Sequence, residues 1–266
     1  MQIVLITGGS SGIGKATGEL LQSNGYAVIG TSRSPDYYTD HPFPLIQMDL
    51  HDATSIQKAV ETVVTKYGSI DVLVNNAGKG IAGPIEETPL EEIRSVFETN
   101  LVGATAVIQS VIPTMRTKNE GKIINITSIA GYSGLPFRAA YSATKSALHM
   151  LTESLRLELK PTNIQCCTLA PGDVATNISQ GRYHVPVKKN SPYYAIYGAA
   201  RKDMDAHVDD GVSAKTVAIS INRLIQKNKL KPHYTVGPFL QRFSIYLKSY
   251  LPAKIYEFIL SKFYKI

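Results

Sequence analysis

Short apolar runs alternate with longer helical patterns along most of this chain, and this alternation limits the folds that it can adopt. The runs are continuous and rich in Ile and Val, as in strands that are covered on both faces of a sheet. Seven runs are predicted to be strands: Gln2–Thr7, Ala27–Ser32, Pro44–Met48, Val72–Asn75, Lys122–Thr127, Asn163–Leu169 and His233–Val236. The helical patterns between them are Ile13–Ser23, Thr54–Lys66, Leu90–Glu98, Gly103–Lys118, Tyr141–Lys160 and Ala214–Gln226. The alternation predicts an α/β fold with a doubly wound parallel sheet and right-handed crossovers.

Bulk composition excludes several classes of protein. The length of 266 residues suits one large α/β domain, and 44% hydrophobic with 18% charged residues excludes wholesale disorder. The adjacent cysteines, Cys166 and Cys167, form neither a disulfide framework nor a zinc spacing. They are predicted to be buried in the core of a protein from a reducing compartment, so the chain is expected in the cytoplasm. The apolar N-terminus lacks a preceding basic segment, which favours a strand over a signal peptide.

The positive charge of the chain is concentrated at its C-terminal end. The 28 Lys and Arg residues exceed the 21 Asp and Glu residues, which makes the formal charge +7. Residues 1–226 are balanced, whereas residues 227–266 hold eight basic residues and one acidic residue. The same forty residues hold nine of the 22 Phe and Tyr residues. We therefore divide the chain into a neutral body, 1–237, and a basic aromatic tail, 238–266.

A glycine-rich turn joins the first predicted strand to the first predicted helix, with the sequence Thr7-Gly8-Gly9-Ser10-Ser11-Gly12-Ile13-Gly14. Glycines let a backbone turn sharply and approach a pyrophosphate, while the helix N-terminus offers free N–H groups and the positive end of its dipole. A tight turn without any ligand would also use glycines. The position between the first strand and the first helix favours a phosphate-binding loop.

The spacing of this loop, T-G-x-x-x-G-I-G, resembles that of the short-chain dehydrogenase/reductase family, and further motifs follow in the family's order. They are Asn75-Asn76-Ala77-Gly78 after the fourth strand, Asn100 in a helical stretch, Ser128 at the end of the fifth strand, Tyr141-Ser142-Ala143-Thr144-Lys145 at the start of a long helix, and Pro171-Gly172-Asp173-Val174-Ala175-Thr176 after the sixth strand. The resemblance implies a Rossmann-type sheet of about seven strands in the order 3-2-1-4-5-6-7, with helices on both faces. It also implies that residues 1–237 form one catalytic domain with a substrate lid near 175–210, followed by a helical appendage.

Tyr141 and Lys145 are four residues apart in a predicted helix, so their side chains share one face. A phenol has an ordinary pKa near ~10, and a nearby ammonium is expected to lower it. The resemblance implies that Tyr141 is the general acid in reduction and the base in oxidation, and that Lys145 lowers its pKa and binds the nicotinamide ribose. It further implies that Ser128 holds the substrate oxygen and that Asn100 orders a water that leads protons to the lysine. Each feature alone has a simpler interpretation. The Tyr141 and Lys145 pair could lie on a solvated helix face, and Asn100 could be an ordinary polar residue of a helix.

The second strand ends without an acidic residue, which bears on the choice of cofactor. An NAD site usually has Asp or Glu after this strand, whereas an Arg there accommodates the 2′-phosphate of NADP. Here Arg33 follows the strand and no acid occurs before Asp36, so we predict NADP(H), with Ser10 adding a hydroxyl. Asp49 resembles the family's adenine-contacting aspartate, although it is also placed to begin a helix.

The full set of residues expected to bind the cofactor comes from six segments. They are Gly8, Ser10, Ser11, Gly12, Ile13 and Gly14; Arg33; Asp49 and Leu50; Asn76, Ala77 and Gly78; Tyr141 and Lys145; and Pro171, Gly172, Val174 and Thr176. Asn75 is expected to stabilise the sheet. His149 and His184 have no partners at metal-ligand spacing, so no metal is predicted.

The lid region holds four tyrosines, Tyr183, Tyr193, Tyr194 and Tyr197, in a segment predicted to be irregular. Such a wall, together with Leu135, Pro136 and Phe137, suits an apolar substrate, although ordinary loop packing would use the same residues. The predicted function is hydride transfer between NADP(H) and a carbonyl or secondary alcohol of a steroid or long-chain keto-lipid. The alternatives are a reductase for small ketones and a non-catalytic NADP sensor. The resemblance also implies a homo-oligomer, either a dimer or a tetramer.

The tail shows two helical apolar stripes separated by Pro252. One holds Phe239, Phe243, Tyr246, Leu247 and Tyr250, and the other holds Ile255, Phe258, Ile259 and Phe263. Basic helices with an aromatic face lie in membrane interfaces, so one interpretation is peripheral membrane contact through residues 239–266. The other interpretation is that the stripes pack on the body or on a second subunit. No segment resembles a base-reading module, so no nucleic-acid partner is predicted.

Overall fold

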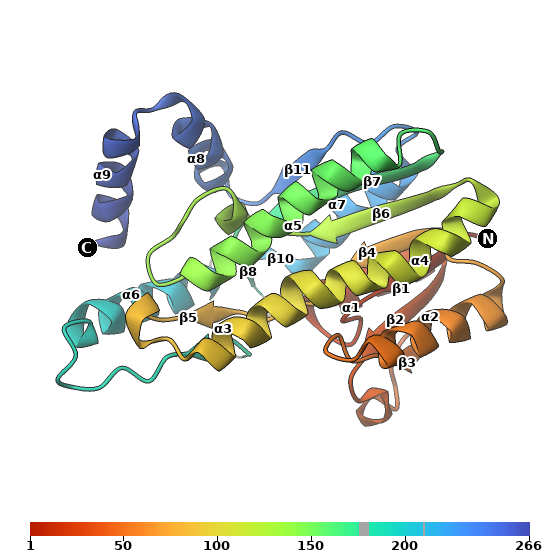
Figure 1. Ribbon diagram of the computed structural model, residues 1–266, viewed down its shortest axis with the longest axis horizontal. Coiled ribbons are helices and arrows are strands. Elements are labelled where there is room, and N and C mark those ends of the chain that lie inside the picture. Colours follow the sequence, from red (N-terminus) through yellow and green to blue (C-terminus); the bar gives the residue numbers. More distant parts are fainter. Residues whose placement is uncertain (176–180, 210) are drawn as a thin grey trace.

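A seven-stranded parallel sheet forms the centre of the computed structural model, which describes residues 1–175, 181–209 and 211–266 (Figure 1). Its strands are β1 (Ile3–Ile6), β2 (Ala27–Ser32), β3 (Leu45–Gln47), β4 (Val72–Asn75), β6 (Gly121–Ile126), β7 (Ile164–Pro171) and β11 (His233–Val236). The order across the sheet is β11-β7-β6-β4-β1-β2-β3. All pairings within this sheet are parallel. The seven predicted strands, their parallel arrangement and their predicted order are therefore confirmed.

The sheet separates two hydrophobic cores because successive side chains of a strand point to opposite faces. In β1, Ile3 and Leu5 enter one core while Val4 and Ile6 enter the other. The predicted core cysteines follow the same rule in β7: Cys166 faces the first core and Cys167 the second. Both are free thiols, and burial raises the pKa of each to about 12. They are therefore inert packing residues.

Helices cover both faces of the sheet. The helices on one face are α1 (Gly12–Ser23) and α7 (Ala214–Gln226), and those on the other are α2 (Ala53–Tyr67), α4 (Ala104–Lys118) and α5 (Ala139–Glu158). Each presents an apolar stripe at helical spacing, such as Val107, Val111 and Met115 of α4, which are fully buried. The glycine loop, the end of β6 and the start of α5 therefore meet at the carboxyl edge of the sheet.

A continuous helix, α3 (Leu90–Phe97) followed by α4, contains one wider turn between its two predicted halves. This turn is a π-helical segment, Glu98–Gly103, and it holds Asn100. The helix is long and apolar enough to span a membrane by length and composition alone. Its apolar stripe packs in the first core, however, which is the arrangement of a core helix.

The lid differs from the prediction, because it is not irregular throughout. Tyr194–Asp209 forms a helix, α6, and Tyr193, Tyr197, Ala200 and Met204 pack together at helical spacing. Two short parallel pairs flank it. They are β5 (Ile81–Ala82) with β9 (Tyr183–His184), and β8 (Val174–Ala175) with β10 (Val212–Ser213). The helix was missed because aromatic and Gly residues have modest helix propensity and obscured the apolar period.

The tail forms two helices, α8 (Phe239–Tyr250) and α9 (Ala253–Tyr264), with the predicted break at Pro252. The pair projects from the α/β body above α5 and α6 (Figure 1).

Candidate functional site

The glycine loop takes a shape that only glycine permits at several positions. Gly8 and Gly12 have φ values of +64° and +52°, in the left-handed region that favours glycine. A Cβ on Gly14 would lie 2.2 Å from the Gly8 carbonyl oxygen and 2.7 Å from Asn76 Nδ2. The loop is therefore folded tightly onto the first turn of α1, as a phosphate-binding loop requires.

Asn76 and Ala77, both predicted cofactor residues, hold this loop in place from the end of β4. The Thr7 hydroxyl accepts hydrogen bonds from the backbone N–H groups of Asn76 (2.9 Å) and Ala77 (3.0 Å). The Asn76 side-chain amide donates to the carbonyls of Thr7 (3.0 Å) and Gly8 (3.1 Å). The role of Thr7 was not predicted, although it begins the glycine motif.

The N-terminus of α1 has unpaired donors at the position expected for phosphate. Ser11 is the N-cap residue, its side chain makes no capping hydrogen bond, and the first turn contains no acidic residue. No carboxylate of this first turn therefore neutralises its free N–H groups and the positive end of the helix dipole. Ser10 precedes this turn and Ile13 lies within it, and both side chains are half-buried. These features fit the pyrophosphate of a dinucleotide.

The residues after β2 and β3 lie along the same edge. Arg33 follows the end of β2 and is exposed, and none of the ion pairs found among the described residues involves it. Asp49 is half-buried, and its Oδ1 accepts a hydrogen bond from the His51 N–H at 3.0 Å. Leu50 is buried against Gly103, where a Cβ would lie 2.4 Å from the Leu50 carbonyl oxygen. Arg33 is thus available to an incoming anion.

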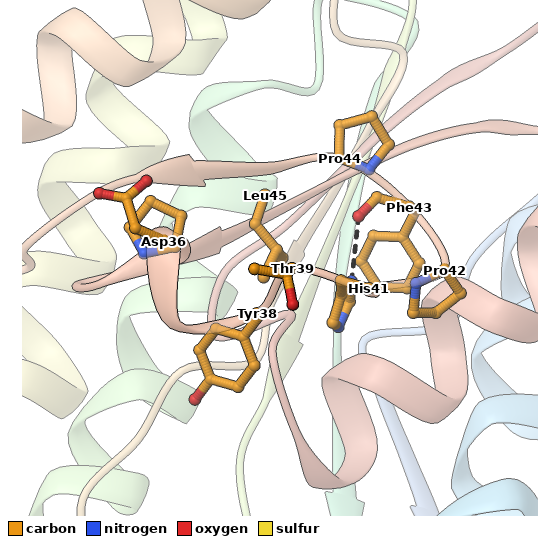
Figure 2. Close-up of a pocket in the computed structure, with 9 residues that line it drawn as sticks. Asp36, Tyr38, Thr39, His41, Pro42, Phe43, Pro44 and Leu45 are labelled. Atoms are coloured by element: carbon orange, nitrogen blue, oxygen red, sulfur yellow. Dashed lines mark hydrogen bonds between the residues drawn. The ribbon is translucent and has the colours of Figure 1, made fainter.

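A surface hollow of about 620 Å³ opens beside the β2–β3 connection (Figure 2). Its lining comes from Pro35, Asp36, Tyr38, Thr39 and residues 41–45. His41 is oriented there by its Nδ1 contact with the Phe43 carbonyl at 3.0 Å. None of the predicted site residues lines this hollow, so we separate it from the catalytic site.

Tyr141, Ser128 and Lys145 come together where β6 meets α5. Ser128 follows β6, and its hydroxyl accepts a hydrogen bond from the Ala130 N–H at 3.1 Å. Lys145 is buried, and its Nζ lies 5.9 Å from the centre of the Tyr141 ring. The structure therefore brings together the three residues that the sequence selected from positions up to seventeen residues apart.

The electrostatics of Tyr141 differ from the prediction. Burial raises the pKa of its phenol, while the Ser128 hydroxyl and the nearby Arg138 and Arg182 guanidinium groups oppose that rise. The Lys145 ammonium donates to the Ile126 carbonyl at 3.0 Å, and burial lowers its own pKa to about 8. The net direction is therefore opposite to the expected lowering, and the groups that oppose the rise are Ser128, Arg138 and Arg182 rather than Lys145.

Asn100 connects the wide helical turn to the Lys79 backbone and to α5. Its Oδ1 accepts from the Lys79 N–H at 2.8 Å, and its amide donates to the Lys79 carbonyl (3.0 Å) and the Thr144 hydroxyl (3.1 Å). A Cβ on Gly78 would lie 3.3 Å from Asn100 Oδ1 and 3.4 Å from Lys145 Nζ. Gly78 therefore leaves open the space between these two polar groups. Lys79 and Thr144 were not assigned a role from the sequence, although Thr144 lies within the motif from Tyr141 to Lys145.

Asn75, which precedes this group, has the structural role expected for it. It is buried, and its amide donates to the Ala104 carbonyl (3.0 Å) and to Asn125 Oδ1 (3.1 Å). It thus ties β4 to α4 and β6.

The segment after β7 is bound to the tail. Pro171 ends β7, the Gly172 N–H donates to the Val236 carbonyl at 2.8 Å, and Val174 is buried in β8. Gln241 of α8 accepts from the Asp173 N–H at 2.9 Å and donates to its carboxylate at 2.6 Å. This contact of the tail could not be read from the sequence. Thr176 lies outside the described residues.

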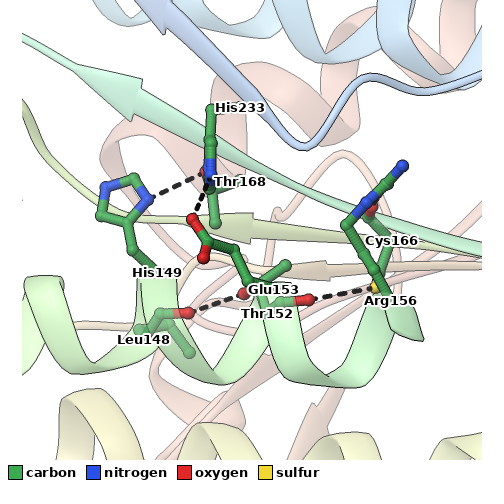
Figure 3. A network of polar contacts seen from close by, with 8 residues as sticks. All are labelled: Leu148, His149, Thr152, Glu153, Arg156, Cys166, Thr168 and His233. Carbon is green, nitrogen blue, oxygen red and sulfur yellow. Dashed lines mark hydrogen bonds and ion pairs between the residues drawn. The ribbon is translucent and has the colours of Figure 1, made fainter. Parts of the chain in front are cut away.

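A polar network with two histidines links α5, β7 and β11 (Figure 3). The Thr168 hydroxyl contacts His149 Nδ1 at 3.1 Å and His233 Nδ1 at 2.8 Å, and His233 pairs with Glu153 at 2.7 Å. Burial, with His233 nearby, lowers the pKa of His149 to about 4, so this ring is neutral near pH 7. Its role is structural. No group of three or more potential metal-ligating side chains occurs within the described residues.

The lid tyrosines differ in what they contact. Tyr197 is buried, and its hydroxyl donates to the Ala82 carbonyl at 2.8 Å. Its ring packs against Phe137, with centroids 5.2 Å apart, and Phe137 has a φ of +59°, which is rare for an aromatic residue. Tyr183 and Tyr141 pack against the same small cluster of Ile81, Val96 and Ala140. Tyr194 is 47% exposed. Tyr183 thus shares a cluster with Tyr141, whereas Tyr197 packs with Phe137 in a separate cluster.

Known proteins resemble this chain in sequence and in overall fold. Residues 2–185 match the family model described as short chain dehydrogenase. A 3-ketodihydrosphingosine reductase of Bacteroides thetaiotaomicron is 35% identical over 266 residues, which cover all of this chain and 98% of that protein. A short-chain dehydrogenase structure from Streptomyces avermitilis is 30% identical, with a TM-score of 0.81 and 94% of both chains covered. Other solved structures of this fold hold NADP or NAD.

Proposed function

The chain belongs to the short-chain dehydrogenase/reductase family and is an oxidoreductase that uses NAD or NADP, and we propose that it reduces the ketone of a long-chain lipid with NADPH. One observation carries the choice of substrate class. The 35% identity to a 3-ketodihydrosphingosine reductase extends over this whole chain, including the tail, rather than over the family's shared core alone.

The arrangement of side chains supports reduction of a carbonyl. Bound nicotinamide would supply the hydride to the carbonyl carbon. The Tyr141 hydroxyl, whose pKa is raised by burial, is protonated near neutral pH and donates its proton to the carbonyl oxygen. Ser128 lies beside Tyr141 to hold that oxygen, and buried Lys145 follows Tyr141 by one turn of α5. In the reverse direction the same hydroxyl, once deprotonated, accepts the proton of the alcohol.

The preference for NADP over NAD is proposed from Arg33. Its guanidinium is exposed at the end of β2, and a planar fork binds a 2′-phosphate through paired hydrogen bonds. We expect Arg33→Ala to lower kcat/KM for NADPH about tenfold or more while changing kcat/KM for NADH less than about threefold. Arg94→Ala, an exposed arginine of α3, is the matched control and should change neither value. An unchanged NADPH/NADH ratio in Arg33→Ala would contradict the proposal.

The aromatic surroundings of Tyr141 support an apolar substrate. Tyr183 packs in the same cluster as Tyr141, Phe137 lies two residues before α5, and the acyl chain of a keto-lipid would offer apolar surface to such side chains. We also propose that the protein works in the cytoplasm as a homo-oligomer through the helices that hold Asn100 and Tyr141.

The test is NADPH oxidation against a panel of ketones. The panel contains 3-ketosphinganine, an acyl-dihydroxyacetone phosphate, a 3-ketosteroid and a small water-soluble ketone. We expect the highest kcat/KM for a long-chain keto-lipid, and Tyr141→Phe reports the background rate. Equal or higher kcat/KM for the small ketone would replace this proposal with a general carbonyl reductase, and no turnover of any ketone would favour a cofactor sensor.

A further inference from the structure

The two tail helices present apolar side chains to solvent rather than to the body. Of the twenty large hydrophobic residues that are exposed in the described part of the chain, ten belong to residues 239–266. They are Phe239 (73%), Leu240 (76%), Phe243 (43%), Tyr246 (61%), Tyr250 (83%), Ile255 (49%), Phe258 (61%), Ile259 (40%), Phe263 (57%) and Ile266 (51%). Monomeric proteins rarely expose apolar side chains at this density, and such patches mark contact surfaces. We call these ten residues the tail surface.

Different side chains attach the same two helices to the body, so the outward direction of the tail surface is built into the fold. Tyr256 is 7% exposed, and its hydroxyl lies 2.8 Å from the hydroxyl of buried Ser133, five residues after Ser128. Lys265 at the end of α9 pairs with Asp203 of the lid helix α6 at 3.1 Å.

At the other helix, Gln241 of α8 is bound to Asp173, and Lys248 donates to the carbonyl of Tyr132. The tail is therefore attached to Tyr132 and Ser133, which follow Ser128, and to the lid helix α6, while its apolar stripes remain exposed.

Basic residues surround the tail surface. Residues 239–266 contain Arg242, Lys248, Lys254, Lys262 and Lys265 against a single acid, Glu257. All five cations are exposed, and Lys262 lies over the Phe258 ring, 5.6 Å from its centre. An interface between two copies through this surface would bring these like charges together, whereas an anionic surface would neutralise them.

We propose that the tail surface docks the enzyme on an anionic lipid bilayer. Aromatic and aliphatic side chains enter the boundary between headgroups and acyl chains, and Lys254 and Lys262, which do not attach the tail to the body, contact anionic headgroups. The helix α9 is bound to Ser133, five residues after Ser128, and to the lid helix α6. Docking through the tail therefore turns this side of the protein towards the membrane. This surface is separate from the catalytic residues, so the proposal does not depend on which ketone is reduced.

The experiment is co-sedimentation of the full chain with vesicles of phosphatidylcholine, with or without phosphatidylglycerol. We expect binding to the anionic vesicles that weakens as salt is raised. Phe258→Ser with Phe263→Ser should lower the partition coefficient at least about tenfold. The matched control, Tyr37→Ser with Ile85→Ser, removes two exposed side chains (86% and 59%) from the body, outside the tail and outside α5, and should leave the partition coefficient within about twofold.

A second pair of variants tests the charges and serves if the aromatic pair does not fold. Lys254→Gln with Lys262→Gln should weaken binding to anionic vesicles about fivefold per charge, whereas Lys58→Gln with Lys160→Gln, on the body, should not. Melting temperature and reduction of a water-soluble ketone verify that each variant is folded, independently of lipid.

Failure of the wild-type protein to bind anionic vesicles would overturn the proposal. It would also be overturned if light scattering showed a wild-type oligomer that dissociates in Phe258→Ser with Phe263→Ser, because the surface would then be a protein interface.

Discussion

Gly14→Ala is the sharpest test of the glycine loop as the cofactor-binding element. The added Cβ would lie 2.2 Å from the Gly8 carbonyl oxygen, whereas ordinary contact begins at 3.4 Å, so the two must separate by about 1.2 Å. The Gly8 carbonyl cannot retreat freely, because Asn76 Nδ2 donates to it at 3.1 Å and would itself lie 2.7 Å from the new carbon. The substitution must therefore displace the loop or the start of α1.

The structure sets the size of both expected effects. Overpacking of this kind costs about 1–3 kcal/mol of the free energy of unfolding, and about 2–4 °C of Tm is lost per kcal/mol in a domain of this size. Displacing the loop by about an ångström also moves its N–H groups from the pyrophosphate, so we expect the Kd for NADPH to rise at least about tenfold.

The assay is a fluorescence titration with NADPH together with thermal unfolding, both with and without the cofactor. Gly198→Ala is the matched control, since a Cβ there meets nothing within 4 Å and the residue lies exposed inside α6. It should keep the wild-type Kd and raise stability by about 0.5–1 kcal/mol. If Gly14→Ala kept both the wild-type Kd and the wild-type Tm, the assignment of this loop would be refuted.

Three further predictions concern Tyr141, the buried His149 and the attachment of the tail through Tyr256. Tyr141→Phe should lower kcat for the best ketone about a hundredfold or more with little change in the Kd for NADPH, and unchanged kcat would exclude Tyr141 as the acid. His149 has a pKa of about 4 in the folded protein and about 6.5 in the unfolded chain. Between these values the unfolded chain binds one more proton, so the free energy of unfolding falls by up to about 3 kcal/mol as the pH drops from about 6.5 to 4. His149→Gln should flatten that part of the pH profile in urea titrations, and a parallel profile would contradict the assignment. Tyr256→Phe removes a hydroxyl from a buried pair with Ser133 and should cost about 1–2 kcal/mol, whereas Tyr250→Phe, 83% exposed, should cost nothing measurable.

Local patterns in the sequence were sufficient for the main features of the fold. A strand buried on both faces must be continuously apolar, so β1 and β7 were recognisable without knowledge of their neighbours. The four-residue spacing of Tyr141 and Lys145 places them on one helix face in any context, and the glycine motif limits the turn before α1. Parallel strands joined by helices then bring these segments to one edge of the sheet.

Tertiary contacts decided the electrostatics and the environment of each group. The sequence predicted that Lys145 would lower the pKa of Tyr141, but the depth of burial determines the sign, and burial is a property of the whole fold. Asn100 reaches Lys79 and Thr144 because one helical turn is wider than the rest, which no spacing in the sequence indicates. The lid helix α6 depends in the same way on packing against Phe137 and Ala82.

The tail shows the division most clearly. The sequence alone determined that it is basic, that it forms two amphipathic helices, and that they separate at Pro252, since charge, period and proline are local properties. Only the tertiary structure decided which face is covered: Gln241 and Tyr256 attach the helices to the body and leave the aromatic stripes in solvent. A hydrophobic period specifies that a face seeks burial, but its partner is set by residues distant in the chain.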